Sequence, residues 1–162
     1  MSYLPLPQPS RPETGTRAHP VGLGAADRLV VKKAERRLYL MRDDQPLRSY
    51  EIALGFQPIG HKTREGDGRT PEGRYLIDRR NDRSRFHKAL HISYPNPGDR
   101  LRAEHRGEPP GGMILIHGQP NGKSRSTRIE DDWTLGCIAV SDREIDEIWS
   151  LTVDGTPIEI LP

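Results

Sequence analysis

Cysteine is the residue that this chain has least of, with one copy, Cys137, among 162 residues. A single thiol excludes an intramolecular disulfide and any metal cluster built from several cysteines. Aromatic residues make up only 6% of the chain, and no run approaches the roughly 20 consecutive apolar residues of a membrane span. We therefore expect no disulfide framework, no cysteine-based metal cluster and no membrane span.

Strong charge is also lacking, because the net charge is +2 and the isoelectric point is near 8.8. Such a mild balance does not predict a nucleic-acid partner. The sharpest bias lies between His61 and Lys88, where nine Lys/Arg face five Asp/Glu. Aromatic side chains that stack on bases are scarce there. This stretch reads as a solvated loop, or alternatively as a groove that receives an anionic substrate.

The first 25 residues carry five prolines among Ser, Thr and Gly and show no periodicity. They predict a disordered N-terminal segment over 1–25, followed by one domain over 26–162. The N-terminus also lacks the apolar core of a secretory signal. Either the protein acts in the cytosol or the given chain starts after its signal, and the sequence leaves this open.

Turn-forming residues are abundant in this chain, with 16 glycines and 15 prolines. They favour short strands over a helical bundle. Three β-prone runs at 29–31, 38–41 and 50–54, separated by polar turns at 33–36 and 42–46, predict an antiparallel meander. Further strands are expected at 74–77, 89–93, 113–116, 137–140 and 157–160. Ser141 and Glu144 have the spacing of a capping box and predict a helix after Ser141, and 99–105 predicts a second, short one. The fold class is therefore mainly β with one or two short helices.

Two segments carry candidate chemistry. One apolar run ends in His117-Gly118, and Cys137 lies between Gly136 and a new apolar run. An imidazole can take the proton of a thiol and later return it to a leaving amine. A backbone carbonyl such as that of Gly118 would orient the ring. The backbone N–H groups of Leu135, Gly136 and Cys137 would then face the oxyanion of a tetrahedral intermediate.

Each of these residues also has a plainer interpretation. A lone cysteine between apolar runs is more often inert packing, and His117 could be a satisfied core histidine. A metal site at His87 and His91 would need a helix, whereas that segment is predicted to be a strand. From spacing alone, the Cys–His pair is only a candidate.

Five stretches in register narrow the choice: "GHKTREGDGRTPEG", "LHISYPN", "PPGGMILIHG", "DWTLGCIAV" and "DEIWSLTVDGTPIEI". Over 28–162 the chain resembles the catalytic domain of the bacterial L,D-transpeptidases, in the proteobacterial branch with a Gly-Cys-Ile-Ala-Val core. The resemblance implies a mainly β, mixed sandwich or barrel-like fold that needs no cofactor. It also implies a place in the periplasm or cell envelope.

The resemblance implies an activity as well. In that family the cysteine attacks the peptide bond after the L-centre of diaminopimelate in a peptidoglycan tetrapeptide stem, and D-alanine leaves. By matching positions, Cys137 is the nucleophile, His117 the base, and Gly118 supplies the orienting carbonyl. Stem peptides are the implied partners, and carbapenems are expected to acylate Cys137. The acyl-enzyme passes to an amine or to water, so transpeptidation and hydrolysis both stay open, beside a non-catalytic wall-binding module.

The chain departs from the family at two positions, with Leu135 where many members have histidine and Ala139 where many have arginine or asparagine. The second departure leaves open how a substrate carboxylate is held. Candidate substrate-binding residues come from the long 55–73 connection, the following strand end and the segment before the cysteine; surface charge, turn formation and core packing are the alternatives. These candidates are His61, Lys62, Arg64, Arg69, His91, Tyr94 and Trp133.

Overall fold

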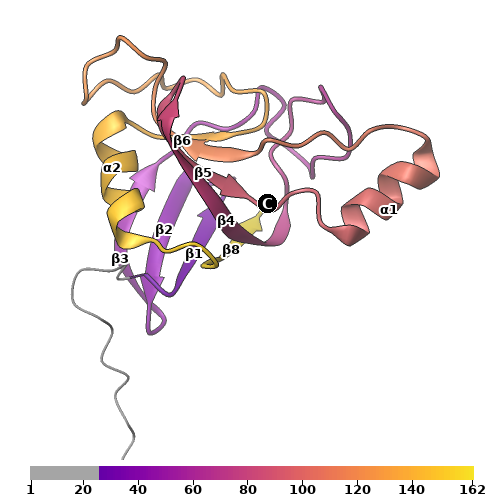
Figure 1. The fold of residues 1–162 in the computed structure, drawn as a ribbon, viewed down its shortest axis with the longest axis horizontal. Helices are drawn as coiled ribbons and strands as arrows, with labels where there is room; N and C mark the ends of the chain where they lie inside the picture. The colour runs from indigo at the N-terminus through magenta and orange to yellow at the C-terminus, as the bar shows by residue number, and fades with distance from the viewer. Residues whose placement is uncertain (1–25) are drawn as a thin grey trace, which may run out of the picture.

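The computed structural model describes residues 26–162. The disordered segment predicted for 1–25 lies outside this range. Eight strands form one mixed sheet in the order β3-β2-β1-β8-β4-β5-β6-β7, and two helices accompany it (Figure 1). The strands are β1 (Arg28–Lys32), β2 (Arg37–Arg42), β3 (Gln45–Glu51), β4 (Gly73–Ser84), β5 (His87–Ile92), β6 (Leu115–His117), β7 (Ile138–Ala139) and β8 (Pro157–Leu161), and the helices are α1 (Pro97–Arg106) and α2 (Asp142–Leu151). The predicted mainly β class with short helices is confirmed.

The antiparallel meander is present as β1, β2 and β3. The prediction of the third strand at 50–54 is wrong, because β3 runs over Gln45–Glu51. Asp43 and Asp44 both adopt positive φ, 49° and 61°. Short acidic side chains tolerate this conformation, so a two-residue turn reverses the chain and lets the next strand begin at once. Beyond Glu51 the chain leaves β3, and Ala53 pairs with Ala139 of β7.

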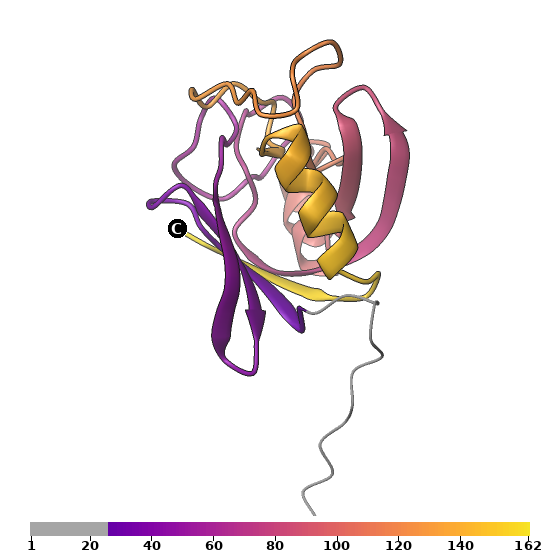
Figure 2. The ribbon, with the colours of Figure 1, turned by 90° about the vertical axis from the view of Figure 1, so that its left-hand side faces the viewer.

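Strand β4 links the two parts of the sheet. Its first residues pair with β8, and its later residues pair with β5. Bulges between Ile77 and Arg79 and between Asn81 and Ser84 bend the strand, as extra residues in a ladder generally do. The β4–β5 hairpin is therefore turned away from the meander, and α2 lies between the two (Figure 2). This bend brings the tip of the hairpin toward the site.

The core fills the inside of this bend. Alternate residues of β1 and β2 are fully buried, among them Leu29, Val31 and Leu38, as expected for strands with one covered face. From α2, Ile145 and Ile148 are fully buried against them. Burying each such side chain is worth about 1.5–3 kcal/mol.

Both helices begin at a capping box, and the sequence predicted the one at Ser141. In α2 the Ser141 hydroxyl accepts from the Glu144 N–H while the Glu144 carboxylate accepts from the Ser141 N–H. Helix α1 starts two residues before its predicted boundary, because Asn96 caps it and Pro97 occupies its first turn. Neither helix of 26–162 is long and apolar enough to cross a membrane.

Candidate active site

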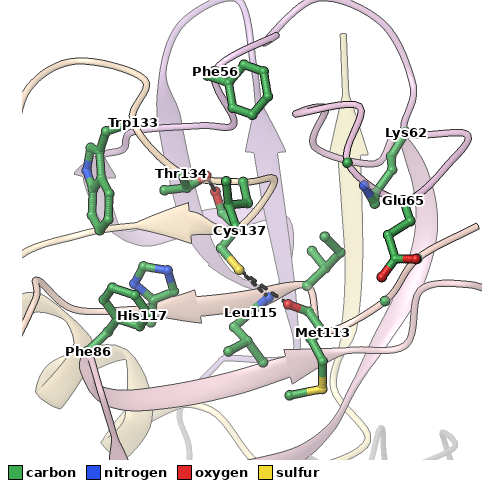
Figure 3. A pocket seen from close by; sticks show the side chains of 15 residues that line it. Phe56, Lys62, Glu65, Phe86, Met113, Leu115, His117, Trp133, Thr134 and Cys137 are labelled. Atoms are coloured by element: carbon green, nitrogen blue, oxygen red, sulfur yellow. Dashed lines mark hydrogen bonds between the residues drawn. The ribbon is translucent and has the colours of Figure 1, made fainter.

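The pairing of β6 with β7 brings the two candidate catalytic side chains together. The strands are parallel, with Ile116 opposite Ile138 and His117 opposite Ala139. Cys137 therefore stands beside Leu115, two positions before the level of His117. Side chains two apart on a strand share a face, so Cys137, Leu115 and His117 point the same way. All three line one pocket of about 600 Å³ (Figure 3).

The wall of this pocket is mainly apolar and comes from several loops around the β6 and β7 ends. Phe56, Phe86, Met113, Trp133 and Leu135 supply most of it. The groups able to carry charge or protons are few: Lys62, Glu65, His117 and Cys137. A concave apolar site with a few convergent polar groups is the usual form of a binding or active site.

The Cys137 thiol is half-buried, so it can be reached from the pocket. Its Sγ accepts a hydrogen bond from the Leu115 N–H and donates one to the Met113 carbonyl, both at 3.4 Å. Burial raises the pKa of the Cys137 thiol, against the smaller opposite effects of the Leu115 N–H and the Lys62 charge. At neutral pH the group is therefore a thiol.

The His117 ring is 1% exposed. Its Nδ1 lies 2.6 Å from the Gly118 carbonyl oxygen. A carbonyl can only accept, so Nδ1 carries the proton and Nε2 keeps a lone pair. Burial lowers the pKa of His117 to about 4, although the hydrogen bond to Gly118 acts in the opposite direction. The ring is thus a neutral base at pH 7.

Two aromatic rings hold His117 in place. Phe86 stacks on it with ring centroids 4.2 Å apart and planes at 21°, and Trp133 meets it edge-on at 5.8 Å. Phe86 lies in the turn between β4 and β5, whose bent hairpin delivers it here. Its carbonyl also accepts from the Gly118 N–H at 2.9 Å. Sequence reasoning did not find Phe86, because nothing local marks an aromatic turn residue as a partner of His117.

The backbone before the thiol is tightly fixed. Gly136 has a φ of 143°, and a Cβ at this position would lie 2.8 Å from the Arg69 carbonyl oxygen. Only glycine fits there. Its N–H already donates to Thr134 Oγ1, whose hydroxyl donates to the Cys137 carbonyl. Of the three predicted oxyanion donors, only the N–H groups of Leu135 and Cys137 have no partner within residues 26–162.

The long 55–73 connection contributes Lys62 and Glu65 to the pocket. Lys62 is 3% exposed and donates from Nζ to the Arg64 carbonyl at 3.0 Å and to Asp67 at 2.9 Å. Burial alone would raise the pKa of Asp67, but the Lys62 bond and three backbone N–H donors outweigh it and lower this pKa to about 2. Asp67 is therefore a fixed anion inside the loop.

A second buried lysine anchors the same loop from outside the pocket. Lys33, just after β1, is 2% exposed. Its Nζ donates to the carbonyls of Gly60 and Thr70 and pairs with Glu72 at 3.1 Å. Burial lowers its pKa, with Glu72 opposing this. Sequence reasoning did not single out Lys33, because its partners lie 27 to 39 residues further along the chain.

Of the remaining candidate residues, only Trp133 lines this pocket. His61 accepts from the Glu72 N–H and donates to Asp99, so both ring nitrogens are used. Tyr94 is buried, and its hydroxyl donates to the Pro110 carbonyl. His91 bonds to Asp78 at 2.6 Å and borders a separate pocket of about 130 Å³. Arg64 and Arg69 also lie outside the pocket, whereas Trp133 both lines it and packs on His117.

The histidines at i and i+4 lie on a strand. His87 and His91 both belong to β5, and they bond to different carboxylates, Asp146 and Asp78. Across residues 26–162, no group of three or more His, Cys, Asp or Glu side chains could hold a metal ion.

A family model, a curated relative and solved structures all match this chain. The family model "YkuD: L,D-transpeptidase catalytic domain" matches residues 26–160. The Escherichia coli K12 protein named "Putative L,D-transpeptidase YafK" is 32% identical over 133 residues, which cover 78% of this chain and 47% of that protein. The chain thus spans about half the length of this curated relative.

Solved structures agree on the fold. Pgp2 of Campylobacter jejuni, described as a helical cell shape determining protein, is 25% identical with a TM-score of 0.64, over 86% of this chain and 50% of that one. The L,D-transpeptidase of Xylanimonas cellulosilytica shares the fold at 16% identity and a TM-score of 0.52, over 85% of this chain and 61% of that one. The chain belongs to the L,D-transpeptidase catalytic domain family.

Proposed function

We propose that this protein is an L,D-transpeptidase that acts on peptidoglycan tetrapeptide stems in the cell envelope. The observation that carries the proposal is the His117 ring, which is neutral, fixed in one tautomer and directed into the same pocket as the Cys137 thiol. A raised thiol pKa means that a standing thiolate is not the reacting species. A base that accepts the proton during attack is then required.

In the first half-reaction the S–H turns from the Met113 carbonyl toward His117, and its proton passes to Nε2. The sulfur attacks the carbonyl carbon of the bond after the L-centre of diaminopimelate. The resulting oxyanion is stabilised by the free N–H groups of Leu135 and Cys137. The C–N bond breaks, His117 returns the proton to the leaving nitrogen, and D-alanine departs. A thioester on Cys137 remains.

In the second half-reaction an amine attacks the thioester and gives a proton to His117. The C–S bond breaks, the proton returns to sulfur, and a new amide is formed. Water could replace the amine and give a tripeptide stem. The apolar wall of Phe86, Trp133 and Leu135 favours transfer, because a poorly hydrated pocket disfavours water as the acceptor.

The test is to incubate the protein with disaccharide tetrapeptides and to analyse the products by mass spectrometry. We expect free D-alanine and cross-linked dimers from the wild type and neither from Cys137→Ala. A carbapenem should add its mass to Cys137, and His117→Ala should slow this acylation by about 100-fold or more. Tripeptides without dimers would assign the hydrolase. Turnover that survives in Cys137→Ala would refute the proposal, and stem binding without any turnover would assign a wall-binding module.

A further inference from the structure

The catalytic pocket has two chemically different ends. The end around His117 is aromatic, with Phe86 and Trp133. The opposite end carries Lys62 and Glu65, and Cys137 lies between the two ends (Figure 3). A ligand whose carbonyl carbon is at the thiol therefore has one ammonium and one carboxylate within the same pocket, on the side away from His117.

Lys62 keeps one donor for a ligand. Its side chain is 4% exposed, and its ammonium donates to the Arg64 carbonyl and to Asp67. An ammonium has three N–H donors, and within residues 26–162 the third has no acceptor. A buried charged donor left unpaired is costly, so an acceptor brought by a ligand gains a strong hydrogen bond there.

Glu65 keeps its whole charge for a ligand. Its carboxylate forms no ion pair and accepts no hydrogen bond within the described part of the chain. The Lys62 charge, in contrast, is balanced by Asp67, whose two oxygens also accept three backbone N–H groups. Among the residues that line the pocket, the unbalanced charge is therefore that of Glu65, which favours a cation.

The two groups are held at a fixed place relative to the thiol. A Cβ on Gly111 would lie 3.0 Å from the Glu65 Cα and 3.3 Å from the Lys62 Cε. The Glu65 N–H also donates to the Pro109 carbonyl at 2.9 Å. Two residues beyond Gly111, the Met113 carbonyl accepts from the Cys137 thiol. The loop, the segment before β6 and the nucleophile thus form one packed unit.

We propose that Lys62 and Glu65 bind a zwitterionic amino-acid centre at the far end of the side chain of the residue being acylated. Lys62 donates to its carboxylate, and Glu65 pairs with its ammonium. In a diaminopimelate stem, the D-centre carries both groups. This inference rests on the proposed function and adds a specificity for the third residue of the stem. It also gives a site for a substrate carboxylate in a chain that has Ala139 after the nucleophile.

The experiment measures stem binding to the full chain with Cys137→Ala, which cannot turn over. Three tetrapeptides are titrated, in which the third residue is meso-diaminopimelate, its D-centre carboxamide, or lysine. We expect the diaminopimelate stem to bind about tenfold more tightly than each of the others, as a lost charged hydrogen bond predicts. Equal affinity for all three would overturn the inference.

Two variants in the same background assign the groups. Glu65→Gln, at an exposed position, should weaken the diaminopimelate and lysine stems by about tenfold and leave a stem with 2-aminopimelate, which lacks the distal ammonium, unchanged. Lys62→Met should remove the preference for carboxylate over carboxamide. Glu108→Gln, an exposed glutamate outside the pocket, is the matched control and should change nothing. If Lys62→Met does not fold, Glu65→Gln alone decides, and an unchanged affinity for the diaminopimelate stem refutes the assignment.

Failure of the inference can be told from failure of the proposed function. Wild-type protein that cross-links diaminopimelate, carboxamide and lysine stems at equal rates keeps the activity and loses the zwitterion site. Stem binding that depends on Glu65, without turnover by the wild type, keeps the site and loses the activity. No binding of any stem overturns both.

Discussion

At the scale of single residues, the proposed nucleophile Cys137 and the proposed base His117 are both uncharged at neutral pH. Burial disfavours the charged form of each group, so it raises the pKa of Cys137 and lowers that of His117. Proton transfer from sulfur to nitrogen then creates an ion pair that a substrate oxyanion and the surrounding dipoles must stabilise. We infer that the pair becomes reactive when a substrate fills the pocket, because a substrate oxyanion could then accept from the unpartnered N–H groups of Leu135 and Cys137.

The low pKa of His117 predicts a measurable loss of stability in weak acid. The ring has a pKa of about 4 when folded and 6.5 ordinarily, so between these values the unfolded chain binds the extra proton. Stability is full above about pH 6.5 and falls as the pH drops toward 4, by on the order of 3 kcal/mol. Urea unfolding of wild type and His117→Gln at pH 7 and pH 4.5 tests this.

The variant should lose clearly less stability than the wild type between these two values. Asp67 does not confuse the result, because its ordinary pKa of 3.8 and its folded pKa of about 2 both lie below pH 4.5. An equal loss in both proteins would mean that His117 has the same pKa in the folded and unfolded chain, so that burial does not hold the ring neutral.

At the scale of elements, the β4–β5 hairpin places Phe86 against the proposed base His117. Replacing Phe86 with Ala exposes His117 to water, so its pKa should move up from about 4 toward 6.5. The acid limb of the acylation rate profile should move to higher pH, and the rate should fall by about tenfold at neutral pH. Stopped-flow acylation by a carbapenem across pH measures both.

Phe56→Ala is the matched control for this element. Phe56 lines the same pocket but makes no ring contact with His117, so its removal should leave the acid limb in place. Phe86→Leu should restore much of the rate because it still covers the ring. A Phe86→Ala profile that keeps its acid limb would show that Phe86 only packs.

Lys33 holds the 55–73 connection in place through its contacts with Gly60, Thr70 and Glu72. Lys33→Met removes three donor bonds and leaves Glu72 without its partner. Breaking a buried pair on one side costs about 3–5 kcal/mol. The neighbouring Lys32 is only half-buried and pairs loosely with Glu35. It offers the control, since Lys32→Met should change the free energy of unfolding by about 0.5 kcal/mol or less. Similar losses from both variants in urea unfolding would show that Lys33 does not anchor the loop.

At the scale of the whole molecule, local patterns were predictable from sequence and distant pairings were not. The meander follows from alternating runs and short turns, and the α2 cap from Ser141 and Glu144. The position of β8 between β1 and β4 depends on the pairing of strands over 40 residues apart, which no local pattern specifies. The contacts of Phe86 depend on the pairing of β5 with β6, and those of Lys33 on residues 27 to 39 positions further along the chain, so local patterns could not predict them either. The His117–Cys137 pair was proposed through the family resemblance, because spacing alone favoured inert packing of the cysteine.

The pairings at the two ends of the domain predict which truncated chains will fold. Residues 26–160 match the family, and Ala26 is buried, with its N–H donating to the Leu151 carbonyl. A chain that begins at Ala26 should therefore unfold in one transition with the same free energy, within about 0.5 kcal/mol.

A chain that ends at Thr156 loses the strand that joins β1 to β4, together with the buried Ile158 and Ile160. Burial of these two side chains alone is worth about 3–6 kcal/mol, comparable to the whole stability of a small domain. Circular dichroism should then show a folded chain in the first case and an unfolded one in the second, and a stable chain without β8 would mean that the two parts of the sheet fold independently.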